Sequence, residues 1–214
     1  MIEKIKNILV LAPHTDDGEF GCGGSIARFI REGKDVYYVA FSTAEESVPD
    51  PWPKDILKTE VKEATKRLGI ESVRVFIFNY KVRELSYHRQ EILEDLVKIK
   101  NNICPDLVFL PSSSDVHQDH STVSIEGIRA FKNTSIFGYE IPWNNIEFRT
   151  EAFVILSDAD INKKLYALDA YNSQKGRSYA SEEFIRSLAR TRGVQIGSQY
   201  AEAFEVIRCL MLYG

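Results

Sequence analysis

The sequence feature that most constrains this chain is an apolar run that reaches Ala12 and ends directly in Pro-His-Thr-Asp-Asp. Such a run, followed at once by polar and small residues, predicts a buried parallel strand, which we place at Ile5–Ala12. His14, Asp16 and Asp17 would then lie at its carboxyl end. One imidazole and two carboxylates suit a divalent cation, with one carboxylate left for proton transfer. A solvated turn is the alternative.

A second polar cluster, Asp115–His120, follows another short apolar run, Leu107–Leu110. Three of the four histidines in the chain lie in these two clusters. Two histidines and a carboxylate, with water as a further ligand, form a common catalytic zinc set. We therefore predict one metal site shared by both clusters, against the alternative of two independent polar loops.

Apolar and amphipathic segments alternate along the chain. A helix is expected at Gly18–Arg31, ended by Gly33, and a strand at Val36–Phe41, which together with the first strand form a right-handed β-α-β unit. Further helices are expected at about 56–68, 87–100, 118–131, 160–171 and 181–190, and strands at 73–78, 107–110, 135–140 and 153–156. Phe204–Leu212 fits either a strand or a buried helix. The pattern predicts an α/β fold with a mostly parallel sheet and helices on both faces.

The order of the strands decides whether the two polar clusters meet. In the doubly wound order 3-2-1-4, the first and fourth strands are neighbours, and ligands bind outside their carboxyl ends. That order would place His14 beside His117 and His120. We therefore expect the candidate site at this switch point of the sheet.

Composition and charge limit the class of protein. With 214 residues, 44% of them hydrophobic, and no linker or repeat, residues 1–214 are expected to form one domain. The net charge of -4 and the scattered Lys and Arg residues argue against nucleic acid or an anionic membrane and favour a small-molecule partner. The N-terminus does not resemble a signal peptide, no segment approaches a membrane span, and three cysteines without CxxC spacing favour the cytoplasm.

Other readings of the first cluster are weaker. Gly21-Cys-Gly-Gly-Ser invites a dinucleotide-binding interpretation, but Ile26 stands where the third glycine belongs, and the upstream aspartates would repel a pyrophosphate. We expect these glycines to allow close packing of helix and sheet. An iron site of two histidines and one carboxylate usually occurs on a β-barrel, and a nucleotide-dependent transferase would need a phosphate-binding loop that the sequence lacks.

The motifs also carry a family resemblance. Ala12-Pro-His-Thr-Asp-Asp-Gly-Glu, Gly21-Cys-Gly-Gly and His117-Gln-Asp-His120 resemble the GlcNAc-PI de-N-acetylase family, also called LmbE-like or PIG-L. The similarity continues in Leu68-Gly69, Tyr171-Asn-Ser-Gln174 and Tyr200-Ala-Glu-Ala-Phe204, so it covers most of the chain. This family consists of zinc-dependent hydrolases that remove an acetyl group from N-acetylglucosamine-type sugars on a Rossmann-like sheet.

The resemblance implies a role for each residue of the two clusters. His14, Asp17 and His120 would bind Zn²⁺, although Fe²⁺ and Co²⁺ tolerate the same ligands. Asp16 would be the general base, and protonated His117 would stabilise the oxyanion. By the same resemblance, Asp119 would hold His117 in position.

Some features depart from the family pattern or stay open. Many members carry an arginine before the glutamate of the second helix that helps to grip the substrate, whereas Leu57 and Lys58 precede Glu60 here. Trp143 could stack on a sugar ring or serve in packing, and with Trp52 it leads us to expect a homo-oligomer. A metal- or sugar-binding module without turnover is the alternative function, and it is disfavoured because a binder would need neither Asp16 nor His117.

Overall fold

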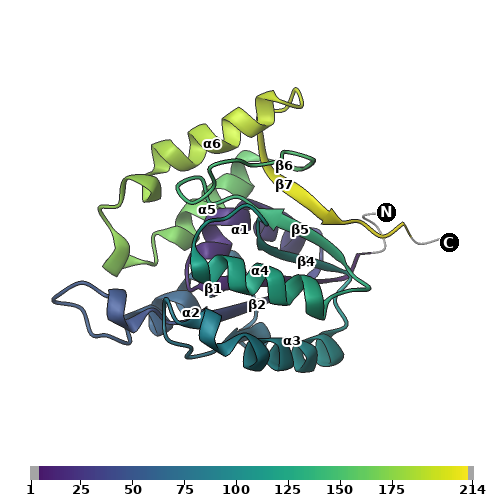
Figure 1. The fold of residues 1–214 in the computed structure, drawn as a ribbon. Coiled ribbons are helices and arrows are strands. Elements are labelled where there is room, and N and C mark those ends of the chain that lie inside the picture. Colours follow the sequence, from purple (N-terminus) through teal and green to yellow (C-terminus); the bar gives the residue numbers. More distant parts are fainter. Residues whose placement is uncertain (1–4, 212–214) are drawn as a thin grey trace.

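A seven-stranded sheet organises the computed structural model, which describes residues 5–211 (Figure 1). The strands are β1 (Asn7–His14), β2 (Asp35–Ser42), β3 (Val75–Ile77), β4 (Leu107–Pro111), β5 (Ser135–Tyr139), β6 (Ala152–Leu156) and β7 (Tyr200–Arg208). The helices are α1 (Asp17–Arg31), α2 (Ile56–Leu68), α3 (Arg89–Ile103), α4 (Gln118–Ala130), α5 (Asp158–Leu168) and α6 (Glu182–Val194). The predicted α/β fold is confirmed.

The strand order is β3-β2-β1-β4-β5-β7-β6. β1 pairs in parallel with β2 on one side and with β4 on the other, so the expected order of the first four strands is confirmed. Of the ambiguous segment Phe204–Leu212, residues 204–208 belong to strand β7, which lies antiparallel between β5 and β6, and residues 209–211 follow the strand. The last expected residue of that segment, Leu212, lies outside the described residues.

Helices cover both faces of the sheet (Figure 1). α1, α2 and α5 pack together on one face, over a core that includes Val10, Phe109 and Phe204. α3 and α4 pack on the other face, over a core that includes Leu9 and Leu11. Neighbouring residues of β1 therefore point to opposite cores, which is why its sequence is apolar without alternation.

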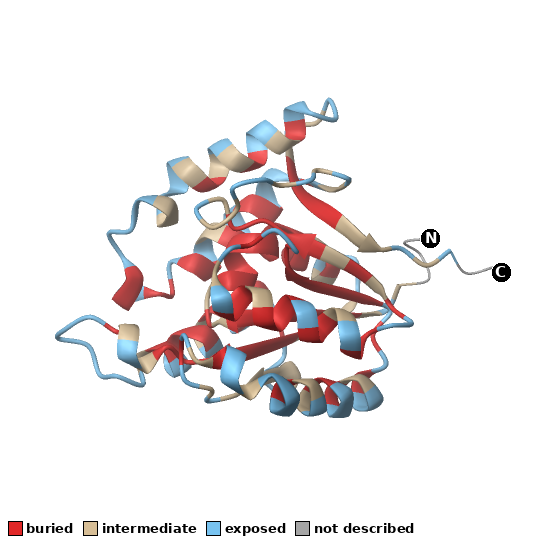
Figure 2. Cartoon of the chain, viewed as in Figure 1, coloured by how far each residue is buried: buried red, intermediate tan, exposed pale blue. Residues whose placement is uncertain are grey.

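The middle of the sheet is the most deeply buried part of the molecule (Figure 2). The five consecutive β1 residues Ile8–Ala12 expose no surface. Burying each large apolar side chain contributes about 1.5–3 kcal/mol relative to leaving it exposed. The strand that delivers the first polar cluster is thus anchored on both faces, and its carboxyl end is a rigid platform.

Two glycines of α1 allow close approach to the sheet. A Cβ atom on Gly18 would lie 2.5 Å from the Tyr38 ring, and one on Gly21 would lie 2.2 Å from the Tyr139 ring. Real Cβ atoms essentially never make contacts this short, so a side chain at either position would force the neighbouring ring to shift. This agrees with the expected packing role of the glycine-rich segment.

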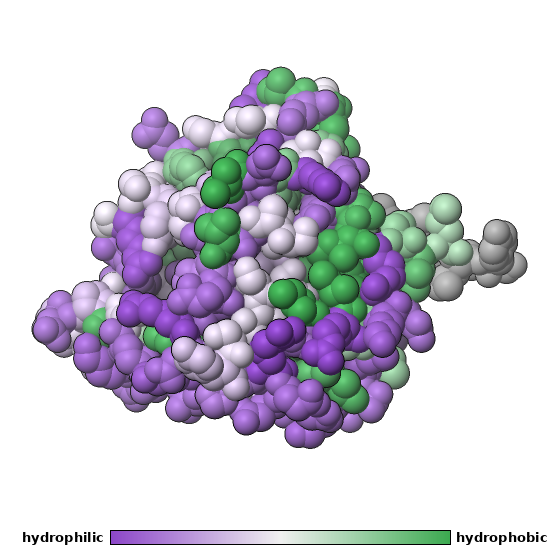
Figure 3. All heavy atoms as spheres, in the orientation of Figure 1, coloured by the Kyte–Doolittle hydropathy of each residue, from purple (hydrophilic) through white to green (hydrophobic). Residues whose placement is uncertain are grey.

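The visible surface is mostly hydrophilic, with hydrophobic residues gathered right of centre in Figure 3. Within residues 5–211, none of the helices combines the length and the apolar character that crossing a bilayer requires. The face in Figure 3 therefore presents polar side chains over most of its area.

Candidate active site

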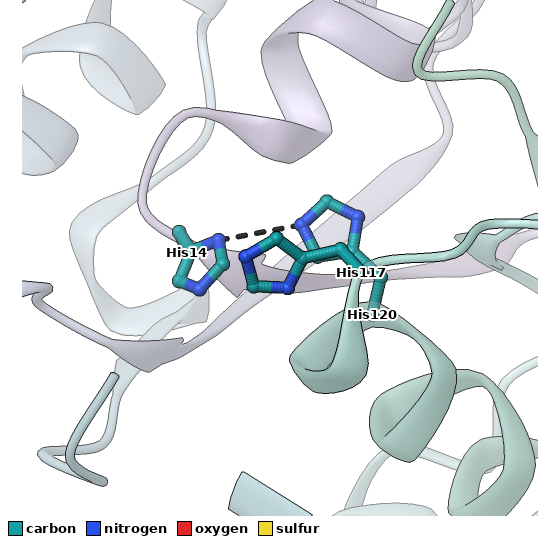
Figure 4. A group of neighbouring side chains, drawn as sticks. All are labelled: His14, His117 and His120. Carbon is teal, nitrogen blue, oxygen red and sulfur yellow. Dashed lines mark hydrogen bonds between the residues drawn. The ribbon is translucent and has the colours of Figure 1, made fainter. Parts of the chain in front are cut away.

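Three imidazoles converge at the carboxyl end of the sheet (Figure 4). His14 is the last residue of β1, His117 caps the N-terminus of α4, and His120 lies in the first turn of α4. β4 brings α4 here because it pairs with β1 and ends at the same edge of the sheet. The two clusters, about a hundred residues apart in the sequence, thus lie side by side as expected.

Three donor atoms lie almost equidistant from one another. Oδ2 of Asp17 is 3.1 Å from Nδ1 of His14 and 3.2 Å from Nε2 of His120, and those two nitrogens are 3.3 Å apart. Ligands of a tetrahedral zinc ion with bonds of 2.0–2.1 Å are separated by about 3.4 Å. The spacing of the three atoms is thus compatible with a shared metal ion, and the atoms belong to the three residues expected as ligands from the resemblance.

Each of these two histidines is held on its other nitrogen by a buried carboxylate. Asp119 Oδ2 lies 3.0 Å from Nε2 of His14, and Asp115 Oδ2 lies 2.7 Å from Nδ1 of His120. Such outer carboxylates fix the orientation and tautomer of ligating imidazoles. The sequence alone predicts no role for Asp115, although this residue opens the second cluster.

The electrostatics of this group favour positive charge. Burial lowers the pKa of His14, but Asp17 and Asp119 outweigh it and raise this pKa to about 9. For His120, burial is outweighed by Asp17 and Asp115, and the pKa rises to about 10. Burial raises the pKa of Asp17, but the two imidazoles lower it well below the ordinary range. The carboxylates thus stabilise a cation here, whether a proton or a metal ion.

His117 is oriented differently from the other two histidines. The three rings also each offer one nitrogen within 4.8 Å of the others, so His14, His117 and His120 form an alternative set of metal ligands. Nδ1 of His117, however, accepts a hydrogen bond of 3.2 Å from the backbone N–H of Asp119. A neutral ring with Nδ1 as acceptor carries its proton on Nε2, which then has no lone pair for a metal. We therefore favour the set with Asp17.

Two expectations about His117 change with this geometry. We expected Asp119 to hold His117, but its carboxylate contacts His14, and only its backbone N–H reaches His117. We also expected a protonated His117 ring, but protonation of Nδ1 would break the hydrogen bond from Asp119. Burial, with the neighbouring His120 and His14, lowers the pKa of His117.

Asp16 lines the same cavity as the three residues that provide these donor atoms. It directly precedes α1 and lines the cavity together with Asp17. Burial, followed by the charge of Asp17, raises the pKa of Asp16 to about 6, while His14 and Arg177 act in the opposite direction. A carboxyl group with a pKa near neutrality can both accept and return a proton.

A cavity of about 370 Å³ opens over the imidazoles. Its wall includes Thr15, Leu57 and Gln174, which belong to sequence features described above. The other lining residues could not be singled out from the sequence, because no local pattern marks them as neighbours of the site. They are Phe20, Ala44, Ser47, Val82, Arg83, Asn144, Arg177 and Tyr179.

Arg83 links the cavity wall to the donor atoms. Its φ of 68° is unusual for a residue other than glycine. This conformation lets its backbone N–H donate to Asp119 Oδ2 at 2.6 Å, while the N–H of Leu85 lies 3.4 Å from Asp119 Oδ1. The loop thus holds the carboxylate that holds His14, and it places the Arg83 side chain in the cavity wall.

Aromatic rings form one side of the cavity. Trp143 stacks on Tyr179 with ring centroids 3.9 Å apart, and the edge of Phe20 packs against both rings. Trp143 is 40% exposed, which leaves part of it open to a ligand. Its position at the cavity agrees with the stacking role weighed above, and the expected homo-oligomer stays a prediction.

Comparisons with known proteins agree with this geometry. A family model described as PIG-L, GlcNAc-PI de-N-acetylase, matches residues 9–131, which include both polar clusters. An uncharacterised deacetylase, YaiS, of Escherichia coli strain K12 is 30% identical over 79% of this chain and 92% of its own length. Diacetylchitobiose deacetylase of Thermococcus kodakarensis is 24% identical, over 98% of this chain and 86% of its own.

A solved structure shows the same fold over nearly the whole chain. N,N'-diacetylchitobiose deacetylase from Pyrococcus horikoshii, in complex with its inhibitor MPG, superposes with a TM-score of 0.81 at 25% identity. The match covers 96% of this chain and 85% of that one. The similarity of the fold therefore extends well beyond the two motifs.

Proposed function

This chain belongs to the PIG-L family of GlcNAc-PI de-N-acetylases and is a hydrolytic deacetylase, and on that premise we propose that it removes the acetyl group of an N-acetylglucosamine-type sugar or glycoside with the help of a bound metal ion. The observation that carries the proposal is the convergence of Asp17 Oδ2, His14 Nδ1 and His120 Nε2 within 3.3 Å of one another. Asp16 and His117 line the same cavity.

His14, Asp17 and His120 are the ligands that we propose, and zinc is the metal that we expect. Two imidazoles and a carboxylate leave room for water, the arrangement of catalytic zinc sites. A metal held there lowers the pKa of water towards neutrality and polarises the carbonyl of the acetamide. Iron(II) and cobalt(II) accept the same ligands, so the ligand set is a stronger claim than the metal's identity.

Asp16 is the residue that we propose as general base and then general acid. It would accept a proton from the attacking water and deliver it to the amine nitrogen as the C–N bond breaks, giving acetate and the free amino sugar. Its raised pKa of about 6 suits both tasks near neutral pH. Asp17 cannot replace it, because Asp17 is held between His14 and His120.

His117 is proposed to stabilise the oxygen that gains negative charge. Its Nδ1 is engaged by the N–H of Asp119, so the neutral ring presents Nε2–H as a fixed donor. A preorganised donor of this kind stabilises a tetrahedral oxyanion without reorganising during the reaction. This differs from the protonated imidazole that we expected from the resemblance, and it needs no charge on His117.

The substrate is proposed to be a small N-acetylated sugar derivative. The cavity of about 370 Å³ accommodates a small ligand, and the exposed part of Trp143 offers a surface for a sugar ring. Arg83 and Arg177 line the wall. We assign to them the substrate-binding role that an arginine near the position of Leu57 and Lys58 has in many family members. A cytoplasmic location is part of the same proposal.

Release of acetate tests the proposed function. The purified, metal-loaded protein should release acetate and a free amine from at least one member of a panel of N-acetylated sugars and glycosides. An Asp16→Asn variant should bind the same substrate and release far less acetate. A wild-type protein that binds sugars but releases no acetate across the panel would instead support the alternative of a binding module without turnover.

A further inference from the structure

Helix α1 is broken in its middle. Cys22 has φ of -145° and ψ of 23°, which are not helical, so residues 17–21 form a separate first turn and residues 23–31 form the main helix. In an unbroken helix the N–H of Gly24 would donate to the carbonyl of Phe20, four residues earlier. The break at Cys22 separates this N–H from this carbonyl. Because both groups are buried, each needs another hydrogen-bond partner.

A buried ion pair supplies those partners. Glu202 Oε1 accepts from the N–H of Gly24 at 3.0 Å and lies 2.7 Å from Nζ of Lys164. Nζ of Lys164 also donates to the carbonyl oxygen of Phe20 at 2.6 Å. The ion pair is therefore inserted between the donor and the acceptor of one helical hydrogen bond. It joins the two parts of α1 to α5 and to β7.

The surroundings show that this arrangement is built into the packing. Lys164 is 4% exposed and Glu202 is 7% exposed. Glu202 Oε2 also accepts from both the N–H and the hydroxyl of Ser25, at 2.7 and 2.6 Å. A Cβ atom on Gly23 would lie 3.0 Å from Lys164 Cγ, and one on Gly24 would lie 3.2 Å from Glu202 Oε1. Gly23 and Gly24 of the Gly21-Cys-Gly-Gly segment thus leave room for the ion pair.

The first turn carries two residues of the site. Asp17 is its first residue and contributes Oδ2 to the donor set, and Phe20, whose carbonyl binds Lys164, lines the cavity and packs on Trp143. This turn is too short to be a stable helix by itself. Its position therefore depends on tertiary contacts. Glu19 accepts a hydrogen bond from the Tyr171 hydroxyl within the turn, and Lys164 provides the contact at the end remote from the imidazoles.

We propose that Lys164 and Glu202 are positioning residues, which hold the separated first turn of α1 so that Asp17 and Phe20 stay in place at the metal site and the cavity. The part that concerns Asp17 rests on the proposed function, because it assumes that Asp17 binds a metal ion. The part that concerns the first turn does not, since it is a statement about the fold. Both parts are tested with the complete chain.

The central variant is Lys164→Met, which keeps the apolar stem and removes the ammonium group. Amide hydrogen exchange of the metal-free protein should become about tenfold faster in residues 17–22 and stay unchanged in residues 26–31, which do not contact the ion pair through their N–H groups, as expected for local loosening. The dissociation constant for Co²⁺, followed by its visible absorption, should rise by about tenfold, the lower end of the effect of groups that support metal ligands.

Arg31→Met is the matched control. Arg31 also joins α1 to α5, through Asp160 Oδ2 at 3.1 Å, but it lies at the far end of the main helix. Its removal should change neither the exchange of residues 17–22 nor the binding of Co²⁺. Equal effects of Lys164→Met and Arg31→Met would overturn the proposal, as would faster exchange spread evenly over the whole chain.

A second variant covers the case that Lys164→Met fails to fold with Glu202 left unpaired. Lys164→Met combined with Glu202→Gln removes both charges, a change that buried ion pairs often tolerate. It should show the same local loosening, and unchanged exchange in residues 17–22 would contradict the proposal. If the wild type bound no Co²⁺, the metal assignment under the proposed function would fail, while the exchange measurement would still decide the role of the ion pair.

Discussion

Asp115 lies 2.7 Å from Nδ1 of His120, while Nε2 of the same ring points to Asp17 at 3.2 Å. With Nδ1–H donated to the carboxylate, the lone pair of Nε2 faces the other donor atoms. Asp119 does the same for His14 by contacting its Nε2, which leaves the lone pair of Nδ1 facing the other donor atoms. The two carboxylates therefore decide which nitrogen of each ring is available to a metal ion.

The first prediction compares the proposed ligand His120 with Asp115, the carboxylate that orients it. His120→Ala should abolish stoichiometric metal binding because it removes a ligand. Asp115→Asn should leave the ligands in place and weaken metal binding by about 10- to 100-fold, the usual effect of losing such a partner. Metal analysis after dialysis against a chelator would check both variants. Full metal content in His120→Ala would contradict the ligand assignment.

The second prediction separates two adjacent aspartates. Asp16→Asn should retain the metal and lower kcat by roughly a hundredfold or more, which is the contribution of a positioned general base. Asp17→Asn should weaken metal binding itself. Each variant is the control for the other, because both make the same chemical change in the same loop. If Asp16→Asn lost the metal while Asp17→Asn kept it, their roles would have to be exchanged.

The third prediction is a pH dependence of metal binding. In the metal-free protein the pKa of His14 is raised to about 9 and that of His120 to about 10. Both imidazoles are then protonated at pH 7 and must lose their protons to bind a metal ion. Apparent metal affinity should therefore rise with pH until these groups are deprotonated. Calorimetry in buffers of different ionisation enthalpy should show proton release at pH 7, and its absence would contradict these pKa directions.

The same raised pKa values affect the stability of the metal-free protein. A histidine whose pKa is higher in the folded than in the unfolded state stabilises the fold below its unfolded pKa of about 6.5. This contribution from His14 and His120 is lost as the pH rises through their folded values. Urea unfolding of metal-free protein should show lower stability at pH 9 than at pH 7, and saturating metal should remove most of this difference.

The fourth prediction concerns the proposed role of Arg177 in substrate binding. Arg177→Gln should raise KM by about tenfold, since a hydrogen bond to a charged group contributes about 1.5–3 kcal/mol. It should change kcat less, because Arg177 lines the cavity wall and is assigned neither a ligand nor a proton-transfer role. Arg186→Gln on the surface of α6 is a suitable control. Steady-state kinetics on the best substrate would check both, and an unchanged KM for Arg177→Gln would exclude this role.

The fifth prediction tests the close approach of α1 to the sheet. Gly21→Ala places a Cβ atom 2.2 Å from the buried ring of Tyr139, which cannot move aside easily because its hydroxyl donates to the carbonyl of Leu11. Overpacking of this kind typically costs about 1–3 kcal/mol of unfolding free energy. Urea unfolding would measure the loss. Combining Gly21→Ala with Tyr139→Leu should recover part of it.

Much of the fold could be predicted because the β1, β2 and β4 regions are apolar runs that end in polar or small residues. α2 begins and ends at the residues expected, since Gly69 with φ of 104° terminates it. Phe204–Leu212 was ambiguous because a short apolar run fits a strand or a buried helix equally well. Pairing with β5 and β6 makes its first part a strand, and the residues of these two strands are distant from it in the sequence.

The site was predictable only where the chemistry is local. His14, Asp17 and His120 stand in compact motifs, and the strand order brought them together. The partner of Asp119 could not be predicted, because neighbouring residues of α4 point in different directions and only the placement of β1 decides which imidazole the carboxylate meets. Arg83 and Arg177 come from irregular loops, whose conformations no periodic pattern in the sequence reveals.

The position of β1 beside β4 also has a consequence for folding. His14 and His120 are 106 residues apart, so the donor set is incomplete until the chain has closed this long loop. Closing it carries an entropic cost that is recovered only when the central strands pair. A metal ion should then bind after strand pairing rather than guide it. Metal uptake would thus serve as a kinetic reporter of the moment at which the two halves of the sheet join.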